Sequence, residues 1–121
     1  MEILQRPCDV EGVTLLALDG GLDYTNAGQF IEKMYQLMDE GYRCVVLDLT
    51  RLTYMSSWGL ASLVRVHHHY AARGARIAFA NLHSAVATLL QISHLDRLFN
   101  LYPTVEAALA SASKCAKPEQ H

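Results

Sequence analysis

The 121-residue sequence has no excess of basic side chains and very few lysines. Ten Lys and Arg residues stand against twelve Asp and Glu residues, and the lysines are Lys33, Lys114 and Lys117. Proteins that bind DNA or RNA need a basic patch to neutralise phosphates. The composition therefore makes nucleic acid a poor candidate for the partner.

Cysteines and long apolar runs are also scarce. Cys8, Cys44 and Cys115 are odd in number and far apart, so they predict neither a disulfide framework nor a zinc site. No apolar stretch approaches the roughly 18 residues of a membrane helix, and no basic and apolar leader pattern opens the chain. We therefore expect a cytoplasmic protein without metal or other cofactor and without membrane insertion.

What the sequence does contain is the composition of one packed domain. Hydrophobic residues make up 51% of the chain and charged residues 18%. A chain of this length and composition can bury a substantial core. We expect a single domain over residues 1–115 and a flexible tail over residues 116–121.

Strand and helix patterns alternate along the chain. Strand patterns cover Ile3–Cys8, Val13–Leu18, Cys44–Leu49, Arg76–Ala80 and Leu98–Tyr102, and helical spacing covers residues 27–38, 59–72, a segment from Ser84, and 105–111. The run CVVLDL is typical of a central strand that is covered on both faces. The alternation predicts an α/β fold with a mostly parallel, mixed sheet of four to five strands and about four helices.

Capping residues set the expected ends of these elements. Asp19-Gly20-Gly21 predicts a turn after the second strand, and Gly41 and Gly74 predict helix ends. Thr25 or Asn26, Ser84 and Thr104 are candidates for helix N-caps. In the second helix the apolar stripe is Leu60, Leu63, Val64, His67 and Ala71, with His69 on the solvated side.

Two loops follow parallel strands and lead into helices, namely GGLDYTNA (20–27) and TRLTYMSSWG (50–59). In open α/β sheets functional groups gather beyond the carboxyl ends of the strands. The N-terminus of a helix also favours negative charge, because its first N–H groups are unpaired. These loops are the expected site, and a phosphate could be held or attached there.

Four segments of the chain together resemble the STAS domain: GGLDYTNAGQF, VVLDLTRLTYMSSWGLASL, RGARIAFANLHSAVATLLQISHLDRLF and TVEAAL. This family includes bacterial anti-sigma factor antagonists and the cytoplasmic modules of sulfate transporters. The resemblance implies a non-enzymatic protein of bacterial regulation that binds an anti-sigma factor, itself a serine kinase. In that branch the kinase phosphorylates a serine at the start of the second helix, and the added charge blocks the contact.

The chain departs from the family at that serine. The antagonist loop reads roughly M-D-S-S-G-L, whereas Met55 to Leu60 reads MSSWGL. Without gaps, Ser56 takes the position of the Asp, Ser57 that of the first serine, and Trp58 that of the phosphoacceptor. Tryptophan has no hydroxyl, so we expect the usual switch to be absent. Ser57 could accept phosphate one residue earlier, although a helix N-cap is the commoner use of such a serine.

The resemblance and the loop positions give five expected partner-binding residues: Asp23, Ser56, Ser57, Trp58 and Gly59. For Asp23 the alternative is a turn residue that binds backbone N–H groups. For Trp58 the alternatives are a binding anchor, since interface hot spots favour Trp, or local packing over Tyr54 or Met55.

The sequence gives weaker support for a phosphoacceptor aspartate, a zinc site or a hydrolase. Asp48 could be a phosphoacceptor like that of a receiver domain, but the acidic pair and the lysine that a receiver needs are not in place, so a structural role is favoured. The side chains of His67, His68 and His69 diverge on a helix and do not predict a zinc site. MSSWG lacks the first glycine of a hydrolase nucleophile elbow. We expect no enzyme.

A second functional hypothesis keeps the fold and changes the partner. Stand-alone STAS subunits of ABC-type lipid transporters bind the transporter ATPase and need no phosphoserine. Trp58 favours this alternative somewhat. The sequence does not fix the oligomeric state.

Overall fold

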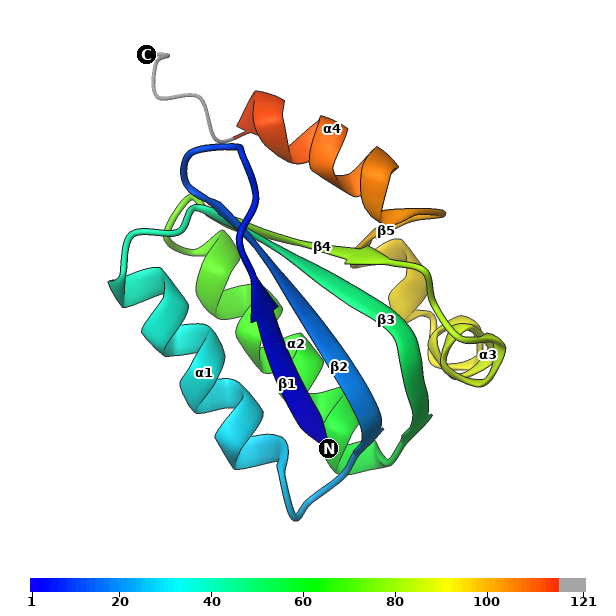
Figure 1. Cartoon of the computed structure of the whole chain (residues 1–121). Helices are drawn as coiled ribbons and strands as arrows, with labels where there is room; N and C mark the ends of the chain where they lie inside the picture. The colour runs from blue at the N-terminus through cyan, green and yellow to red at the C-terminus, as the bar shows by residue number, and fades with distance from the viewer. Residues whose placement is uncertain (116–121) are drawn as a thin grey trace.

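Five strands form one sheet in the order β1-β2-β3-β4-β5 (Figure 1). The computed structural model describes residues 1–115, so the expected tail over 116–121 lies outside the described residues. The strands are β1 (Glu2–Arg6), β2 (Val13–Leu22), β3 (Cys44–Met55), β4 (Arg76–Ala80) and β5 (Asn100–Tyr102). The helices are α1 (Ala27–Asp39), α2 (Ser57–Ala71), α3 (Ser84–Ile92) and α4 (Val105–Cys115), with a 3-10 turn at Leu95–Arg97.

The sheet is mixed, as predicted. β2, β3, β4 and β5 pair in parallel, and β1 pairs antiparallel with β2. Each parallel connection passes through a helix, which is the usual way to return a chain to the same edge of a sheet. The predicted α/β fold, with a mostly parallel sheet and four helices, is confirmed.

β3 is the central strand, and both of its faces are covered. Val45 and Leu47 belong to the large core cluster that α1, α2 and α3 complete, whereas Cys44 and Val46 belong to a smaller cluster under α4. All four side chains are fully buried. Figure 1 shows α4 on the other side of the sheet from α1 and α2. The continuous apolar run CVVLDL is explained by this double coverage.

β2 and β3 are longer than the sequence predicted. Asp19-Gly20-Gly21 was expected to form a turn but stays in β2, and residues 50–55 were expected in a loop but stay in β3. The two strands keep pairing up to Leu22 and Met55 through two register shifts. Bulges of this kind absorb residues that do not fit a regular ladder.

Three helix boundaries agree with expectation, one agrees in part and one does not. Asn26 stands at the N-cap position of α1, but its side chain makes no capping hydrogen bond. The Thr104 hydroxyl accepts a hydrogen bond from the Ala107 N–H at 3.0 Å, and Gly41 and Gly74 have positive φ just after α1 and α2. The N-cap of α3 is His83 rather than Ser84, because the His83 Nδ1 accepts from the Ala85 N–H at 3.2 Å.

The face of α2 that is buried differs from the apolar stripe predicted from the sequence, because the helix is rotated about its axis. It consists of Gly59, Ser62, Leu63, Val66 and Tyr70. Ala71 is exposed, and the Tyr70 hydroxyl reaches into the core to donate to the Met34 carbonyl at 2.6 Å. His69 was expected to be solvated but is half-buried, because its ring stacks on Tyr35 with centroids 3.9 Å apart.

Candidate functional site

The start of α2 is capped by Ser56. Its backbone is extended, and its Oγ accepts a hydrogen bond from the Gly59 N–H at 3.4 Å. Ser57 is already the first helical residue and is exposed. Within residues 1–115 the Ser57 hydroxyl makes no hydrogen bond. Of the two adjacent serines, the first therefore holds the backbone and the second presents its hydroxyl to solvent.

Gly59 fixes where α2 meets the sheet. It is buried, and a Cβ at this position would lie 2.3 Å from the Leu22 carbonyl oxygen and 2.9 Å from side-chain carbons of Leu22 and Met55. The Ser56 N–H also donates to the Leu22 carbonyl at 3.0 Å. Only glycine permits this close approach. Gly59 therefore contributes to the site by placing the exposed residues before it.

The β2–α1 turn uses its polar side chains internally. The Asp23 Oδ1 accepts from the Thr25 N–H at 2.9 Å and from the Thr25 hydroxyl at 2.5 Å. Asn26 accepts from the Asp23 N–H at 2.9 Å and donates to the Gly21 carbonyl at 2.8 Å. The hydrogen bonds from Thr25, the hydroxyl first, lower the pKa of the Asp23 carboxyl. Asp23 is a turn residue here, and a role in docking stays a prediction.

Tyr24 and Trp58 form an exposed aromatic pair. Their side chains are 71% and 64% exposed, and their ring centroids lie 6.3 Å apart at an angle of 50°. Tyr54 lies elsewhere, over Gly21, where its ring would meet an added Cβ at 3.0 Å. Trp58 therefore has a neighbour from the other loop and leaves most of its ring to solvent.

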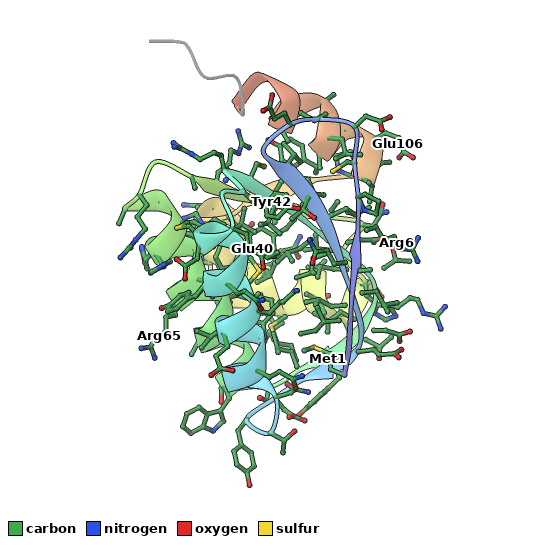
Figure 2. The ribbon with its side chains drawn as sticks, turned by 60° about the vertical axis from the view of Figure 1, so that its left-hand side comes forward. Met1, Arg6, Glu40, Tyr42, Arg65 and Glu106 are labelled. Atoms are coloured by element: carbon green, nitrogen blue, oxygen red, sulfur yellow. The ribbon has the colours of Figure 1, made fainter. Side chains whose placement is uncertain are left out.

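A groove of about 280 Å³ runs beside this pair, between α1 and α2. It is lined by Tyr24, Ala27, Gly28, Ile31, Trp58, Ala61, Ser62 and Arg65. Arg65 is exposed and, among residues 1–115, has no ion-pair partner; Figure 2 shows it pointing outward. The groove is mostly apolar with one cation at its rim, a composition typical of protein-binding surfaces.

The sequence contained a signal for this groove that was missed. Trp58, Ala61, Ser62 and Arg65 follow the spacing i, i+3, i+4, i+7 of one helix face. Tyr24 directly follows Asp23 in the loop of the first helix. Trp58 was predicted as part of the site, but Tyr24, Ala61, Ser62 and Arg65 were not, because the rotation of α2 decides which of its faces is open.

Asp48 lies on β3 and is half-buried. Its Oδ1 accepts from the Thr50 N–H at 3.1 Å and from the Thr50 hydroxyl at 2.6 Å, which supports the structural interpretation. The strand order also differs from the 2-1-3-4-5 order of flavodoxin-like folds such as receivers. Within the described residues no three His, Cys, Asp or Glu side chains are grouped to hold a metal ion.

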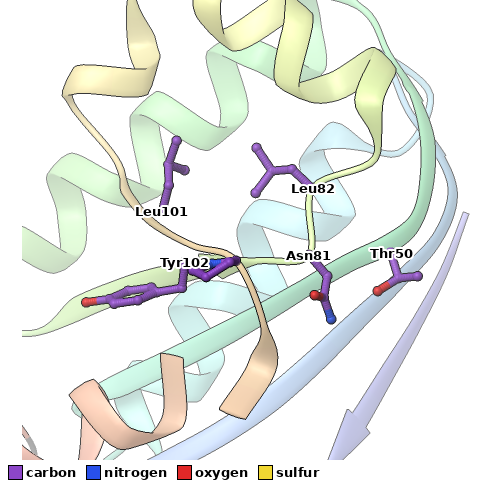
Figure 3. Close-up of a pocket in the computed structure, with 6 residues that line it drawn as sticks. Thr50, Asn81, Leu82, Leu101 and Tyr102 are labelled. Atoms are coloured by element: carbon purple, nitrogen blue, oxygen red, sulfur yellow. The ribbon is translucent and has the colours of Figure 1, made fainter. Parts of the chain in front are cut away.

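A second hollow of about 670 Å³ lies beyond the carboxyl ends of β4 and β5 (Figure 3). It is lined by Thr50, Asn81, Leu82, Leu101, Tyr102 and Pro103. The Tyr102 hydroxyl is already engaged by Arg76 and by the Ser111 hydroxyl. Among the described residues the lining contains no carboxylate, imidazole or amine, and its one acidic hydroxyl, that of Tyr102, is held by these two contacts.

None of the helices in residues 1–115 has the length and apolar character needed to cross a bilayer.

The STAS domain family model matches residues 9–108, which is most of the chain. The protein therefore belongs to the STAS domain family.

The relatives point to one branch of that family. BtrV of Bordetella bronchiseptica, provisionally named an anti-sigma factor antagonist, is 32% identical over 109 residues, covering 90% of this chain and 93% of BtrV. The chain is thus an anti-sigma factor antagonist-like STAS domain.

Solved structures show the same fold. A Thermotoga maritima protein provisionally described as an anti-sigma factor antagonist superposes with a TM-score of 0.82 at 22% identity, covering 90% of this chain and 92% of that one. The Bacillus cell fate determinant SpoIIAA in its phosphorylated form gives 0.71 at 18% identity, covering 92% and 99%.

Proposed function

We propose that the protein acts without catalysis, by binding an anti-sigma factor that is also a serine kinase. Binding uses the docking surface, which we define as Asp23, Tyr24, Ser57 and Trp58. The observation that supports this most is Trp58, which is 64% exposed at the helix start where the family has its acceptor serine. The names of the relatives support the choice of partner. We expect this interaction in the cytoplasm.

The aromatic pair would supply most of the binding energy. An aromatic side chain buries about 150–250 Å² when it is covered, and Trp and Tyr are enriched among hot spots. Tyr24 and Trp58 are largely solvated in the free protein, so a partner would remove much apolar surface from water. The adjacent groove has room for one side chain of that partner, with Arg65 available to an acidic group.

We further propose that this interface lacks the phosphoserine switch. With Trp58 at the acceptor position, the added charge that would release the partner cannot be placed there. The test is incubation with the cognate kinase and ATP, followed by mass spectrometry of the 50–65 segment. We expect no phosphate. Phosphate on Ser57, absent in Ser57→Ala, would contradict the loss of the switch, and phosphate on Asp48 would support the receiver alternative.

The alternative partner is the ATPase of an ABC-type lipid transporter. A permanently bound subunit has no need of a phosphoacceptor, so the tryptophan at position 58 also fits this hypothesis. The same surface would then serve a constant rather than a regulated contact. The two hypotheses differ in the partner and not in the residues that bind it.

Affinity capture from the native cell with mass spectrometry separates the two. An anti-sigma kinase as the main partner supports the first hypothesis, and a transporter ATPase supports the second. Recovery of neither would contradict both. Trp58→Ala, captured in parallel, should lose the partner, whereas Ile92→Ala should keep it, because Ile92 is similarly exposed but lies on α3.

A further inference from the structure

Within residues 1–115 the outer edge of β1 has no strand beside it. β1 is the first strand of the sheet and, in this described part of the chain, pairs only with β2. Every second residue of such an edge strand directs its N–H and C=O outward without a strand partner. Figure 2 shows Arg6 at one end of this strand and Met1, which directly precedes it, at the other. The edge is thus a possible template for another strand.

The sequence of β1 is complementary to itself. It reads EILQR, with an acid at one end, a base at the other and Leu4 in the middle. If a second copy pairs antiparallel about Leu4, then Glu2 faces Arg6 of that copy at both ends. Opposite charges directly across an antiparallel pair are stabilising, and the two leucines meet at the centre.

Within residues 1–115 the charges of Glu2 and Arg6 have no ion-pair partner. The cross-strand neighbour of Glu2 is Asp19, a like charge, and that of Arg6 is Leu15. Asp19 itself is paired with Arg51 at 2.9 Å. A second copy would supply the missing counter-charge to both residues.

The side chains on both faces of β1 leave room for a second copy. Ile3 packs toward the core on the side of α1, so Glu2, Leu4 and Arg6 lie on the opposite face of the sheet. Leu4 is 40% exposed at the rim of a hollow of about 210 Å³. On the α1 side the Gln5 amide is held by Thr14 and Lys33 of its own chain, and a hollow of about 300 Å³ bordered by Ile3, Glu32 and Lys33 leaves space beside the edge.

We propose that two copies of this chain associate through β1, antiparallel and centred on Leu4, so that their two five-stranded sheets become continuous across a two-fold axis. The interface is isologous, with the same residues on both sides. It uses β1 and not the docking surface, so it does not depend on the proposed function.

Sedimentation velocity over a range of protein concentrations is the first test. The parent chain should show a concentration-dependent dimer. Arg6→Glu and Glu2→Arg should each weaken it by roughly tenfold or more, because an attractive pair becomes repulsive at both ends. Both residues are exposed, so the variants should keep the melting temperature of the parent. A monomer at every concentration would overturn the proposal.

A charge swap tests the register. The double variant Glu2→Arg with Arg6→Glu should dimerise like the parent, and a mixture of the two single variants should form heterodimers although each alone is monomeric. If the swap or the mixture does not restore association, the proposed register is wrong.

Cross-linking gives an independent measure. Leu4→Cys should form an intermolecular disulfide readily, since the two Cβ atoms would lie about 5 Å apart, whereas Glu2→Cys should not, since the two copies of residue 2 would lie about 13 Å apart. Equal cross-linking of both variants would contradict the arrangement.

Discussion

The two helix starts next to each other in the site, one before α1 and one before α2, use their side chains in opposite ways. Both follow parallel neighbours, β2 and β3, whose ends are paired at Leu22 and Met55. Before α1, Asp23 and Asn26 turn inward and hydrogen-bond the backbone of their own loop. At α2, Ser56 makes one long cap bond, while Ser57 and Trp58 project outward.

The two turns therefore differ in what holds their backbone and in what they expose to solvent. The first turn is held by its polar groups and offers a single exposed aromatic, Tyr24. The second is held by Gly59 against the sheet and offers Trp58 and a free hydroxyl. A surface that presents aromatic rings from two fixed backbones loses little conformational freedom on binding, which favours affinity.

The largest effect should come from Gly59→Ala. Its Cβ would overlap the Leu22 carbonyl oxygen, which is backbone and cannot turn away, so α2 must shift from the sheet. We expect a loss of about 3 kcal/mol or more in the free energy of unfolding, measured by urea denaturation.

Gly28→Ala is the matched control, since a Cβ there meets nothing within 4 Å. It should leave stability unchanged or raise it by up to about 1 kcal/mol, because alanine is the better helix former. Equal destabilisation by both substitutions would contradict the role of Gly59.

Asn26→Ala should have the next largest effect. It removes the acceptor for the Asp23 N–H and the donor to the Gly21 carbonyl. We expect a loss of about 1–2 kcal/mol in urea denaturation. Asn26→Asp keeps the acceptor alone and should lose less; an unchanged Asn26→Ala would mean that the turn is not held by this side chain.

Substitutions of the two serines should have smaller effects on the free energy of unfolding. Ser56→Ala removes the N-cap of α2 and should cost about 0.5–1 kcal/mol, at the low end because the hydrogen bond is long. Ser57→Ala should stay within about 0.5 kcal/mol of the parent, since its hydroxyl is exposed. The reverse order in thermal unfolding would assign the cap to Ser57.

The smallest effect concerns pH. Because Thr25 lowers the pKa of Asp23, the turn is stabilised above the ordinary Asp pKa of about 3.9, and this stabilisation is lost as the pH falls through the lower folded value. In NMR titration, Asp23 should have a midpoint below the ordinary value. Thr25→Val should raise that midpoint, and Thr50→Val should not change it.

The fold was predictable because its signals are local and repeated. Each signal lies within a short stretch of sequence: the continuous apolar run of β3, the helical spacing of α1 and the capping residue Thr104. Together they predict the order of strands and helices in the layers. The lengths of β2 and β3 were not predictable from Asp19-Gly20-Gly21, because strand pairing across the sheet overrode the local preference for a turn.

The candidate site stays a prediction, but parts of its geometry could be anticipated from the two loops at residues 20–27 and 50–59. The exposure of Trp58 was one of two open alternatives, and the structure has it 64% exposed. The neighbour Tyr24 and the groove down to Arg65 depend on how α1 and α2 pack, which no single segment encodes. Likewise, the choice of Ser56 over Ser57 as the cap rests on where the helix begins relative to Leu22.

The most direct measurement is the affinity of the partner recovered from the native cell for three forms of the protein. By calorimetry, Trp58→Ala should bind at least about thirtyfold more weakly than the parent, corresponding to about 2 kcal/mol, because it removes the central aromatic of the docking surface. Ile92→Ala, with a side chain of similar exposure on α3, should bind like the parent. Unchanged affinity for Trp58→Ala in a folded protein would contradict the docking surface proposed for this chain.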